Sequence, residues 1–354
     1  MMSILDSKLW NSDLDETIKA LPELEELAGT SVLVTGATGL ICSAAIDMLI
    51  RWNRRHDKPI RILAAGRNGK KILDRFAPYG SESWFSFIPY DASSSSTSLE
   101  TACDYIIHGA SNASPNKIIN EPVETMLSNF VGLKCLLDLL KQQDGKRLLY
   151  ISSSEVYGKK EGDQMFREDE YGYIDLLNPR NSYSVGKRAA ETLCASYAAE
   201  YGVDSVIVRP GHIYGPTASE TDNRVSSAWA YTAARGEDIV MKSAGSQIRS
   251  YCYCLDCASA VLKALLKGES LHAYNISNPD SIISIRGMAE ILAKTAGIEL
   301  KMDLPTEAEK KAFNPMSNSS LDSRALLALG WKGLFNAERG FSHTVRILRD
   351  KTSF

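Results

Sequence analysis

A short β-branched run followed at once by two closely spaced glycines constrains the fold of this chain more than any other feature. The run Ser31–Thr35 has the composition of a buried strand, Gly36 and Gly39 follow it, and an apolar helical run extends to about Ile50. A glycine can turn the chain tightly and let the backbone approach a bound group, and the start of a helix offers free N–H groups to an anion. Strand, glycine turn and helix in this order predict a dinucleotide site in a parallel α/β sheet, although Cys42 stands where a third glycine is usual.

Residues after the next two predicted strands bear on the choice of dinucleotide. A strand is predicted over residues 60–65, and Arg67 follows it where an NAD enzyme usually places an acid for the ribose hydroxyls. An arginine there can pair with a 2′-phosphate, which favours NADP, or it can stack on adenine or point to solvent. Asp91 follows the strand predicted over residues 84–90 and is a candidate for the adenine end of the cofactor.

Apolar runs and helical segments continue to alternate along the first two thirds of the chain. Repeated strand–helix units build an α/β fold with a doubly wound parallel sheet. The remaining predicted elements are strands over residues 104–108, 148–151 and 203–208 and helices over residues 121–143 and 183–201.

The alternation also predicts the division into domains. Residues 30–210 are expected to form the dinucleotide-binding domain, and residues 1–29 an N-terminal helical extension that covers this domain or forms a dimer contact. After residue 210 the alternation fades. Residues 211–354 are therefore predicted to form mainly a substrate-binding lobe, with a segment near 250–280 returning to the first domain.

The composition excludes several classes of function. The 354 residues carry a net charge of −3 with a pI near 6.0, so neither a nucleic-acid partner nor an anionic membrane surface is predicted. No apolar run reaches the roughly 18 residues needed to span a bilayer, and the acidic N-terminus is unlike a signal peptide, which indicates a cytoplasmic protein. Seven cysteines fit reduced thiols, and Cys252, Cys254 and Cys257 lack the further ligands of a metal site, so no metal is predicted.

The apolar run over residues 148–151 ends in hydroxyl groups and one carboxylate. Ligands of open parallel sheets bind beyond the carboxyl ends of the strands, so Ser153 and Glu155 are expected to point into a crevice. The plainer interpretation is that the three serines, including Ser154, only mark a polar transition from strand to loop.

A tyrosine and a lysine at helical spacing supply the remaining chemistry. Tyr183 and Lys187 are four residues apart and share one side of the predicted helix. A tyrosine has an ordinary pKa of about 10, so it can act as a base near neutral pH only if a nearby positive charge, here Lys187, lowers that pKa. Ser153 can hydrogen-bond the same substrate oxygen, which predicts an alcohol oxidation in which Tyr183 is the base. Taken alone, such a pair is usually an exposed feature of a helix.

Residues from about 31 to 345 resemble the extended short-chain dehydrogenase/reductase family, which comprises sugar-nucleotide epimerases, dehydratases and decarboxylases. The segments that carry this resemblance are Gly36-Ala37-Thr38-Gly39, Asp91, Ser153, Glu155-Val156-Tyr157-Gly158, Tyr183-Ser184-Val185-Gly186-Lys187, Arg209-Pro210, Tyr214-Gly215-Pro216 and Arg249-Ser250-Tyr251.

The resemblance implies a Rossmann-type fold with a smaller C-terminal substrate lobe, bound NAD or NADP, a nucleotide-sugar substrate and a homodimer. Within the family, three segments look most like UDP-glucuronate decarboxylases, namely Ala110–Pro115, Ser153–Glu155 and Asn178–Tyr183. The implied cofactor residues are Gly36, Thr38, Gly39, Leu40, Ile41, Arg67, Asp91, Ala110, Ser111, Tyr183 and Lys187. The implied substrate residues are Ser114, Ser153, Ser154, Glu155, His212 and Arg249, and the implied catalytic residues are Ser153, Glu155, Tyr183 and Lys187.

Decarboxylases of this type oxidise C4 of the sugar, lose the C5 carboxylate from the resulting β-keto acid and return the hydride to C4. Related 4,6-dehydratases carry an aspartate just before the glutamate as their acid, and Ser154 cannot take that role. Epimerisation stays open, and Cys42 and Arg67 depart from the cofactor pattern of the decarboxylases. Alternatives from other classes are a reductase of ketosugars or small carbonyls that exchanges NADPH and a non-catalytic scaffold that senses dinucleotides.

Overall fold

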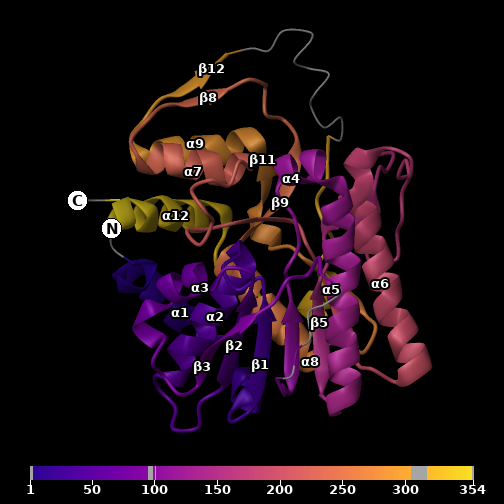
Figure 1. Ribbon diagram of the computed structural model, residues 1–354. Helices are drawn as coiled ribbons and strands as arrows, with labels where there is room; N and C mark the ends of the chain where they lie inside the picture. The colour runs from indigo at the N-terminus through magenta and orange to yellow at the C-terminus, as the bar shows by residue number, and fades with distance from the viewer. Residues whose placement is uncertain (1–2, 95–98, 100, 304–316, 353–354) are drawn as a thin grey trace.

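The computed structural model describes residues 3–94, 99, 101–303 and 317–352. They form a sheet domain and a smaller lobe, which holds α7 (Val225–Ala234) and α9 (Ile285–Ala296) and lies at the top of Figure 1. The lobe begins where the chain leaves the carboxyl end of the strand Ser205–Pro210, and it therefore overlies the edge where parallel α/β sheets bind ligands.

Seven parallel strands in the order β10-β6-β5-β4-β1-β2-β3 form the main sheet. The order reverses between β1 and β4, so the sheet is doubly wound and the predicted α/β fold class is confirmed. The strands predicted over residues 60–65 and 203–208 lie one or two residues further along. The bounds are β1 Ser31–Thr35, β2 Arg61–Gly66, β3 Phe85–Pro89, β4 Tyr105–His108, β5 Arg147–Ile151, β6 Ser205–Pro210 and β10 Ala273–Ile276.

Helices cover both faces of this sheet, which explains why its strands read as continuous apolar runs. On one face, Val34 and Leu149 belong to a core shared with α2 (Leu40–Asn53) and α8 (Cys254–Lys267). On the other face, Leu33, Leu148 and Tyr150 pack with two long helices, α5 (Pro122–Gln143) and α6 (Ser182–Tyr201), seen at the right of Figure 1. Successive strand residues thus alternate between two buried layers.

The smaller lobe is built from short strands and helices. A three-stranded sheet has the order β11-β9-β7, and β8 pairs with β12. Residues 254–276 leave this lobe, because α8 packs on the main sheet and β10 pairs with β6 at its edge. The remaining bounds are α3 Gly69–Arg75, α4 Pro115–Asn120, α11 Arg324–Ala328, α12 Ala337–Thr352, β7 His212–Tyr214, β8 Ile239–Met241, β9 Ile248–Tyr253, β11 Ile282–Ser284 and β12 Leu300–Met302.

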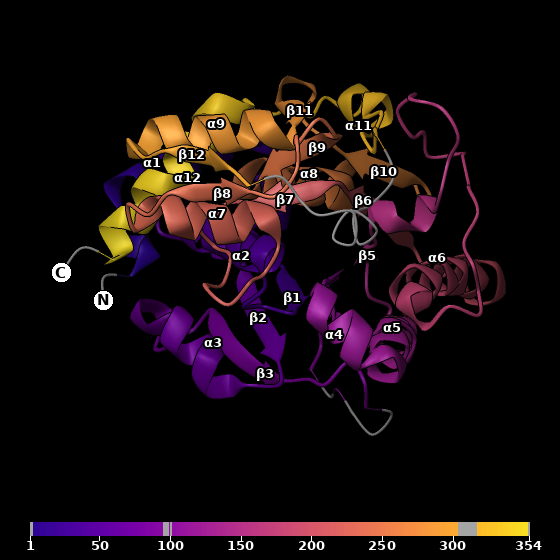
Figure 2. The same ribbon diagram turned by 90° about the horizontal axis from the view of Figure 1, so that it is seen from above.

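The N-terminal segment packs against the chain itself. Helix α1 (Lys8–Lys19) contacts α2, α8 and α12, and Trp10 and Leu14 are buried. Figure 2, seen from above, shows α1 beside α12. The apolar stripe of this segment therefore covers the sheet domain and its junction with the lobe.

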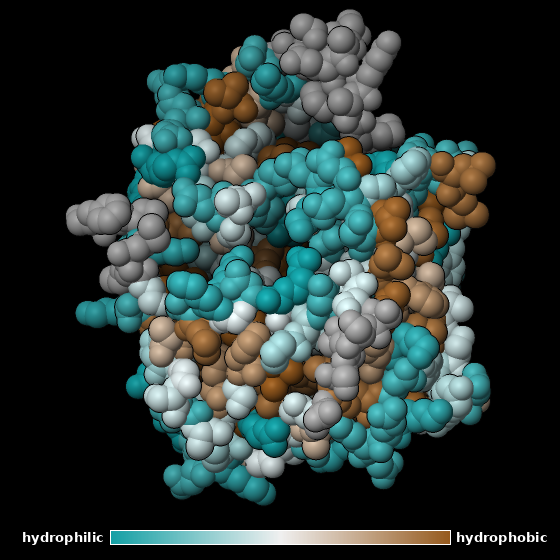
Figure 3. All heavy atoms as spheres, viewed as in Figure 1, coloured by the Kyte–Doolittle hydropathy of each residue, from teal (hydrophilic) through white to brown (hydrophobic). Residues whose placement is uncertain are grey.

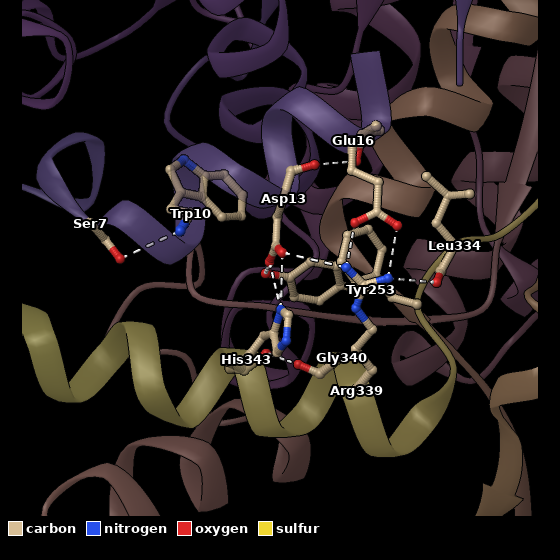
Figure 4. A network of polar contacts seen from close by, with 12 residues as sticks. Ser7, Trp10, Asp13, Glu16, Tyr253, Leu334, Arg339, Gly340 and His343 are labelled. Carbon is tan, nitrogen blue, oxygen red and sulfur yellow. Dashed lines mark hydrogen bonds and ion pairs between the residues drawn. The ribbon is translucent and has the colours of Figure 1, made fainter. Parts of the chain in front are cut away.

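A polar network joins α1 to β9 and to α12 (Figure 4). The buried Asp13 carboxylate accepts a hydrogen bond of 3.1 Å from the Tyr253 hydroxyl and lies 3.0 Å from Nδ1 of His343. One turn further along α1, Glu16 binds both terminal nitrogens of Arg339. The N-terminal helix is thereby tied to the strand that carries Arg249.

Three further features concern the cysteines, membrane spans and metal sites. All seven cysteines are free thiols, and six of them are buried. Among the helices that the structure describes, none has both the length and the apolar character of a membrane span. No cluster of three or more histidine, cysteine, aspartate or glutamate side chains within the described residues is arranged to hold a metal ion.

Candidate active site

The glycine turn between β1 and α2 is shaped for close approach. Gly36 has a φ of +70°, and a Cβ at this position would lie 2.9 Å from the backbone nitrogen of Ala110, so a side chain is excluded by conformation and by space. Gly39 is the N-cap residue of α2 and supplies no side-chain cap. The first turn of α2, with Leu40 and Ile41, therefore offers backbone N–H groups and a positive dipole end. These features fit a dinucleotide pyrophosphate.

Cys42 fits this turn because of a glycine elsewhere in the chain. A Cβ added to Gly109 would overlap the sulfur of Cys42 and would approach Ile151 to 3.2 Å. A glycine at position 42 would make room between the helix and the sheet. Here Gly109, on the loop after β4, makes that room instead. The departure at Cys42 is therefore accommodated without opening the turn.

The two residues expected near adenine lie at the ends of adjacent strands. Arg67 is exposed and follows β2, whereas Asp91 follows β3 and accepts hydrogen bonds from the backbone and the hydroxyl of Ser93, at 3.0 and 2.7 Å. Burial opposes ionisation of Asp91, but the hydrogen bonds from Ser93 and the charge of Arg67 hold its pKa below the usual value. The Arg67 and Asp91 side chains therefore interact electrostatically.

The small-residue loop after β4 borders the glycine turn. The backbone N–H of Ala110 donates to Oγ1 of Thr35 at 3.3 Å, and the Ser111 hydroxyl donates to Asn129 at 2.9 Å. Ser114 caps α4 and accepts from the N–H of Lys117 at 3.4 Å. Ala110 therefore lies beside Gly36, whereas Ser114 also serves the start of a helix.

The structure brings Ser153, Tyr183 and Lys187 together. Tyr183 and Lys187 are buried on α6, and the Ser153 hydroxyl lies close enough to the Tyr183 phenol to lower its pKa. The Lys187 ammonium donates to the carbonyl of Ile151 at 2.7 Å, and its nitrogen lies 5.7 Å from the centre of the Tyr183 ring. The end of β5 and the first turns of α6, which are distant in sequence, thus bring these three side chains into one polar cluster.

The pKa of Tyr183 is shifted in the direction opposite to the one expected. Burial and the charge of Glu155 raise the pKa of Tyr183, while the hydrogen bond to Ser153 and the charge of Arg224 lower it. The expectation that Lys187 would pull this pKa down is therefore wrong for the protein without bound ligand, because the desolvation of the phenol dominates. Burial also lowers the pKa of Lys187 to about 7, against the charge of Glu191. Lys187 can accordingly gain or lose a proton near neutral pH.

Glu155 lies at the edge of this group. It is exposed in the 3₁₀ turn η4 (Ser154–Tyr157), its backbone N–H donates to Ser153 Oγ at 3.1 Å, and its carboxylate accepts a 3.0 Å hydrogen bond from the Ser184 hydroxyl. Ser154, partly buried, opens the same turn. A carboxylate is thus held beside the Tyr183 phenol and reaches solvent.

His212 and Arg249 come from neighbouring strands of the smaller lobe. Arg249 is buried on β9, and the His212 ring lies 5.8 Å from the ring of Tyr251 on the same strand. The His212 side chain is exposed, and its surroundings together with the charges of Arg249 and Arg224 lower its pKa, which favours the neutral imidazole at pH 7. Figure 3 shows a hollow between this lobe and the sheet domain below it.

Sequence reasoning missed several residues of the site. Arg224 stands at the N-cap position of α7 without a side-chain cap, pairs with Asp222 at 2.5 Å and acts electrostatically on both Tyr183 and His212. Behind the strand end, Glu191 accepts from the Ser152 hydroxyl at 2.6 Å and pairs with the buried Arg209 at 2.7 Å. The only local signal for Arg224 is its position just before an apolar helical run.

Comparison with known proteins establishes the family. The model of the NAD dependent epimerase/dehydratase family matches residues 32–277. The chain belongs to this family. The predicted family and the predicted kind of protein, an NAD-dependent enzyme of nucleotide-sugar metabolism, are thereby confirmed at this level.

Individual relatives and structures agree with this assignment. UDP-glucuronic acid decarboxylase 1 of Xenopus tropicalis is 29% identical over 347 residues, which cover 98% of this chain and 79% of the relative. UDP-glucuronic acid decarboxylase 6 of Arabidopsis thaliana is 30% identical over 305 residues, which cover 85% of this chain and 83% of the relative. The crystal structure of UDP-glucose 4-epimerase from Thermotoga maritima matches with a TM-score of 0.76 at 21% identity and covers 91% of this chain and 99% of that one. That match shows the shared fold.

Proposed function

We propose that the protein decarboxylates a UDP-sugar acid of the UDP-glucuronate type by transient oxidation at C4. The observation that carries this proposal is the joint placement of Ser153, Tyr183 and Lys187 with the Glu155 carboxylate beside them. The two decarboxylase relatives, each matched over more than three quarters of its length, support the choice of substrate.

The oxidation half of the reaction is assigned to the first three residues. Tyr183 takes the proton of the C4 hydroxyl as its own phenol proton passes to Lys187, whose pKa of about 7 leaves part of the amine free to accept it, and Ser153 hydrogen-bonds the same oxygen. A dinucleotide on the glycine turn supplies the acceptor and donor of hydride. Gly36, Thr38 and Gly39 with the first turn of α2 would hold its pyrophosphate.

The second half is assigned to the residues around Glu155. Once C4 is a ketone, the electrons left by the departing carboxylate can be held as an enolate, so no acid on a leaving hydroxyl is required. Glu155 then positions the substrate or transfers the proton at C5. The residue before it is Ser154, which cannot act as an acid, and decarboxylation needs no acid at that position. His212, Arg224 and Arg249 provide a neutral ring and two cations for the diphosphate and the sugar carboxylate.

The proposal includes a preference for NADP, a homodimer and a cytoplasmic location. Arg67 supports NADP, and free cysteines fit a reducing compartment. A second copy of the chain fits the exposed apolar stripe of α5, at helical spacing, which Figure 3 shows as brown spheres on the right flank. The residues of this stripe are Val123, Met126, Leu127 and Phe130.

One experiment tests the reaction directly. The purified protein is denatured to identify any released dinucleotide, and intact protein is incubated with a panel of nucleotide sugars followed by mass. We expect loss of carbon dioxide from UDP-glucuronate; loss of water, or an unchanged mass with an altered sugar configuration, contradicts the proposal. Tyr183→Phe should abolish turnover with the fold intact, whereas Tyr201→Phe, on the exposed end of the same helix, should not.

A further inference from the structure

Ser184 makes a contact that the reaction as described does not use. It follows Tyr183 in the first turn of α6, it is 6% exposed, and its hydroxyl donates a 3.0 Å hydrogen bond to Oε2 of Glu155. The two residues are 29 positions apart, so the contact joins α6 to the turn η4 after β5. A buried hydroxyl therefore points at an exposed carboxylate at the edge of the site.

The hydroxyl is not needed by its own helix. Serines in helices commonly bond a carbonyl of the preceding turn, and serines at helix starts commonly cap free N–H groups. The N-cap of α6 is Asn181, which makes no side-chain cap. The neighbouring Ser182 is buried as well, yet its hydroxyl has no hydrogen-bond partner among the described residues. Only the second of these two serines faces a functional group.

Glu155 depends on few contacts for its orientation. Its backbone is fixed by the bond from its N–H to Ser153, but its side chain is exposed and has three rotatable bonds. The bond from Ser184 restricts these rotations. Because Ser153 holds the backbone of Glu155 and Ser184 directly follows Tyr183, the carboxylate so held lies at the edge of the oxidation site.

We propose that Ser184 is a positioning residue that holds the Glu155 carboxylate directed at the sugar for the step after oxidation. This inference rests on the proposed function, in which Ser153, Tyr183 and Lys187 perform the oxidation and Glu155 acts afterwards. Loss of the Ser184 hydroxyl should then spare formation of the keto intermediate and slow its further conversion.

The test compares Ser184→Ala with Ser184→Thr, which keeps a hydroxyl, and with Ser182→Ala, which removes the unpartnered neighbour. For Ser184→Ala we expect cofactor reduction in a single turnover at close to the wild-type rate and an overall turnover about 10- to 100-fold lower, the range for a lost hydrogen bond to a charged group. Ser184→Thr should restore the overall turnover, and Ser182→Ala should behave as wild type.

Combination with Glu155→Gln separates a local role from a structural one. If Ser184 acts through Glu155, the double variant loses no more than Glu155→Gln alone. Slowed cofactor reduction in the single turnover of Ser184→Ala, or additive losses in the double variant, overturns the inference. The proposed function is tested separately, by whether the wild type converts UDP-glucuronate. The Ser184 variants are compared on whichever nucleotide-sugar reaction the wild type performs.

Discussion

Gly109 and Cys42 share one space, since a Cβ on Gly109 would overlap the sulfur of Cys42. The family's glycine turn normally relies on small residues of the helix, and here the loop after β4 provides the missing room. The two positions are 67 residues apart by number, and their packing fixes the distance between α2 and β4 at the cofactor edge.

Gly109→Ala is therefore expected to destabilise the protein by about 1–3 kcal/mol, the usual cost of overpacking a core. Cys42→Gly in the same chain should recover much of this loss, because it removes the overlapping sulfur. Urea unfolding measures both variants. Gly287→Ala is the matched control, since a Cβ there meets nothing closer than 3.4 Å within α9, and it should be neutral or stabilising by up to about 1 kcal/mol. Equal losses with and without Cys42→Gly would contradict the shared space.

The pattern of predictable and unpredictable features follows from sequence distance. The strands, the glycine turn and the Tyr183–Lys187 pair are local patterns, and the order of strands in such sheets then brings Ser153 to them. The pairs Cys42–Gly109 and Glu155–Ser184 have no local signal, because each joins separate elements. The sign of the Tyr183 pKa shift also depends on burial in the folded chain.

Lys187 should make stability depend on pH in a defined window. Its folded pKa is about 7 and its ordinary value 10.5, so between these values the unfolded state binds more protons and the free energy of unfolding rises with pH. Relative to Lys187→Met, the wild type should gain up to about 1.4 kcal/mol per pH unit in this range. Urea unfolding of both proteins at several pH values checks this expectation. A difference that is flat with pH would show that burial does not lower the pKa of Lys187.

The buried pair of Arg209 and Glu191 supports the strand end from behind. Glu191→Gln leaves the Arg209 charge unpaired at 2% exposure of its side chain and should cost about 3–5 kcal/mol of unfolding free energy. Replacing both residues together, as Arg209→Met with Glu191→Leu, should cost less than this. Arg286→Ala breaks a pair that is exposed on both sides and should change stability by less than about 1 kcal/mol. Similar losses in the two single variants would contradict the importance of burial.

The N-terminal helix offers a matched pair of carboxylates that both face α12 (Figure 4). Asp13→Ala removes the buried partner of Tyr253 and His343 and should cost about 1–3 kcal/mol, because it leaves polar groups unpaired. Glu16→Ala breaks a half-exposed pair with Arg339 and should cost at most about 1 kcal/mol. Thermal or urea unfolding ranks the two variants, and a larger loss for Glu16→Ala would contradict the role given to Asp13.

The choice between NAD and NADP depends on Arg67. This exposed arginine at the end of β2 can form charge-assisted hydrogen bonds with a 2′-phosphate, which NAD lacks. After removal of any copurified dinucleotide, Arg67→Ala should weaken binding of NADP by about 10- to 100-fold and leave binding of NAD nearly unchanged, as measured by calorimetric titration. Lys70→Ala, a nearby exposed cation on α3, is the control for general charge and should alter neither. Equal weakening for both cofactors would instead assign Arg67 to adenine stacking, because the adenine ring is common to the two. No weakening for either would place the side chain in solvent, and the preference for NADP would then have no support.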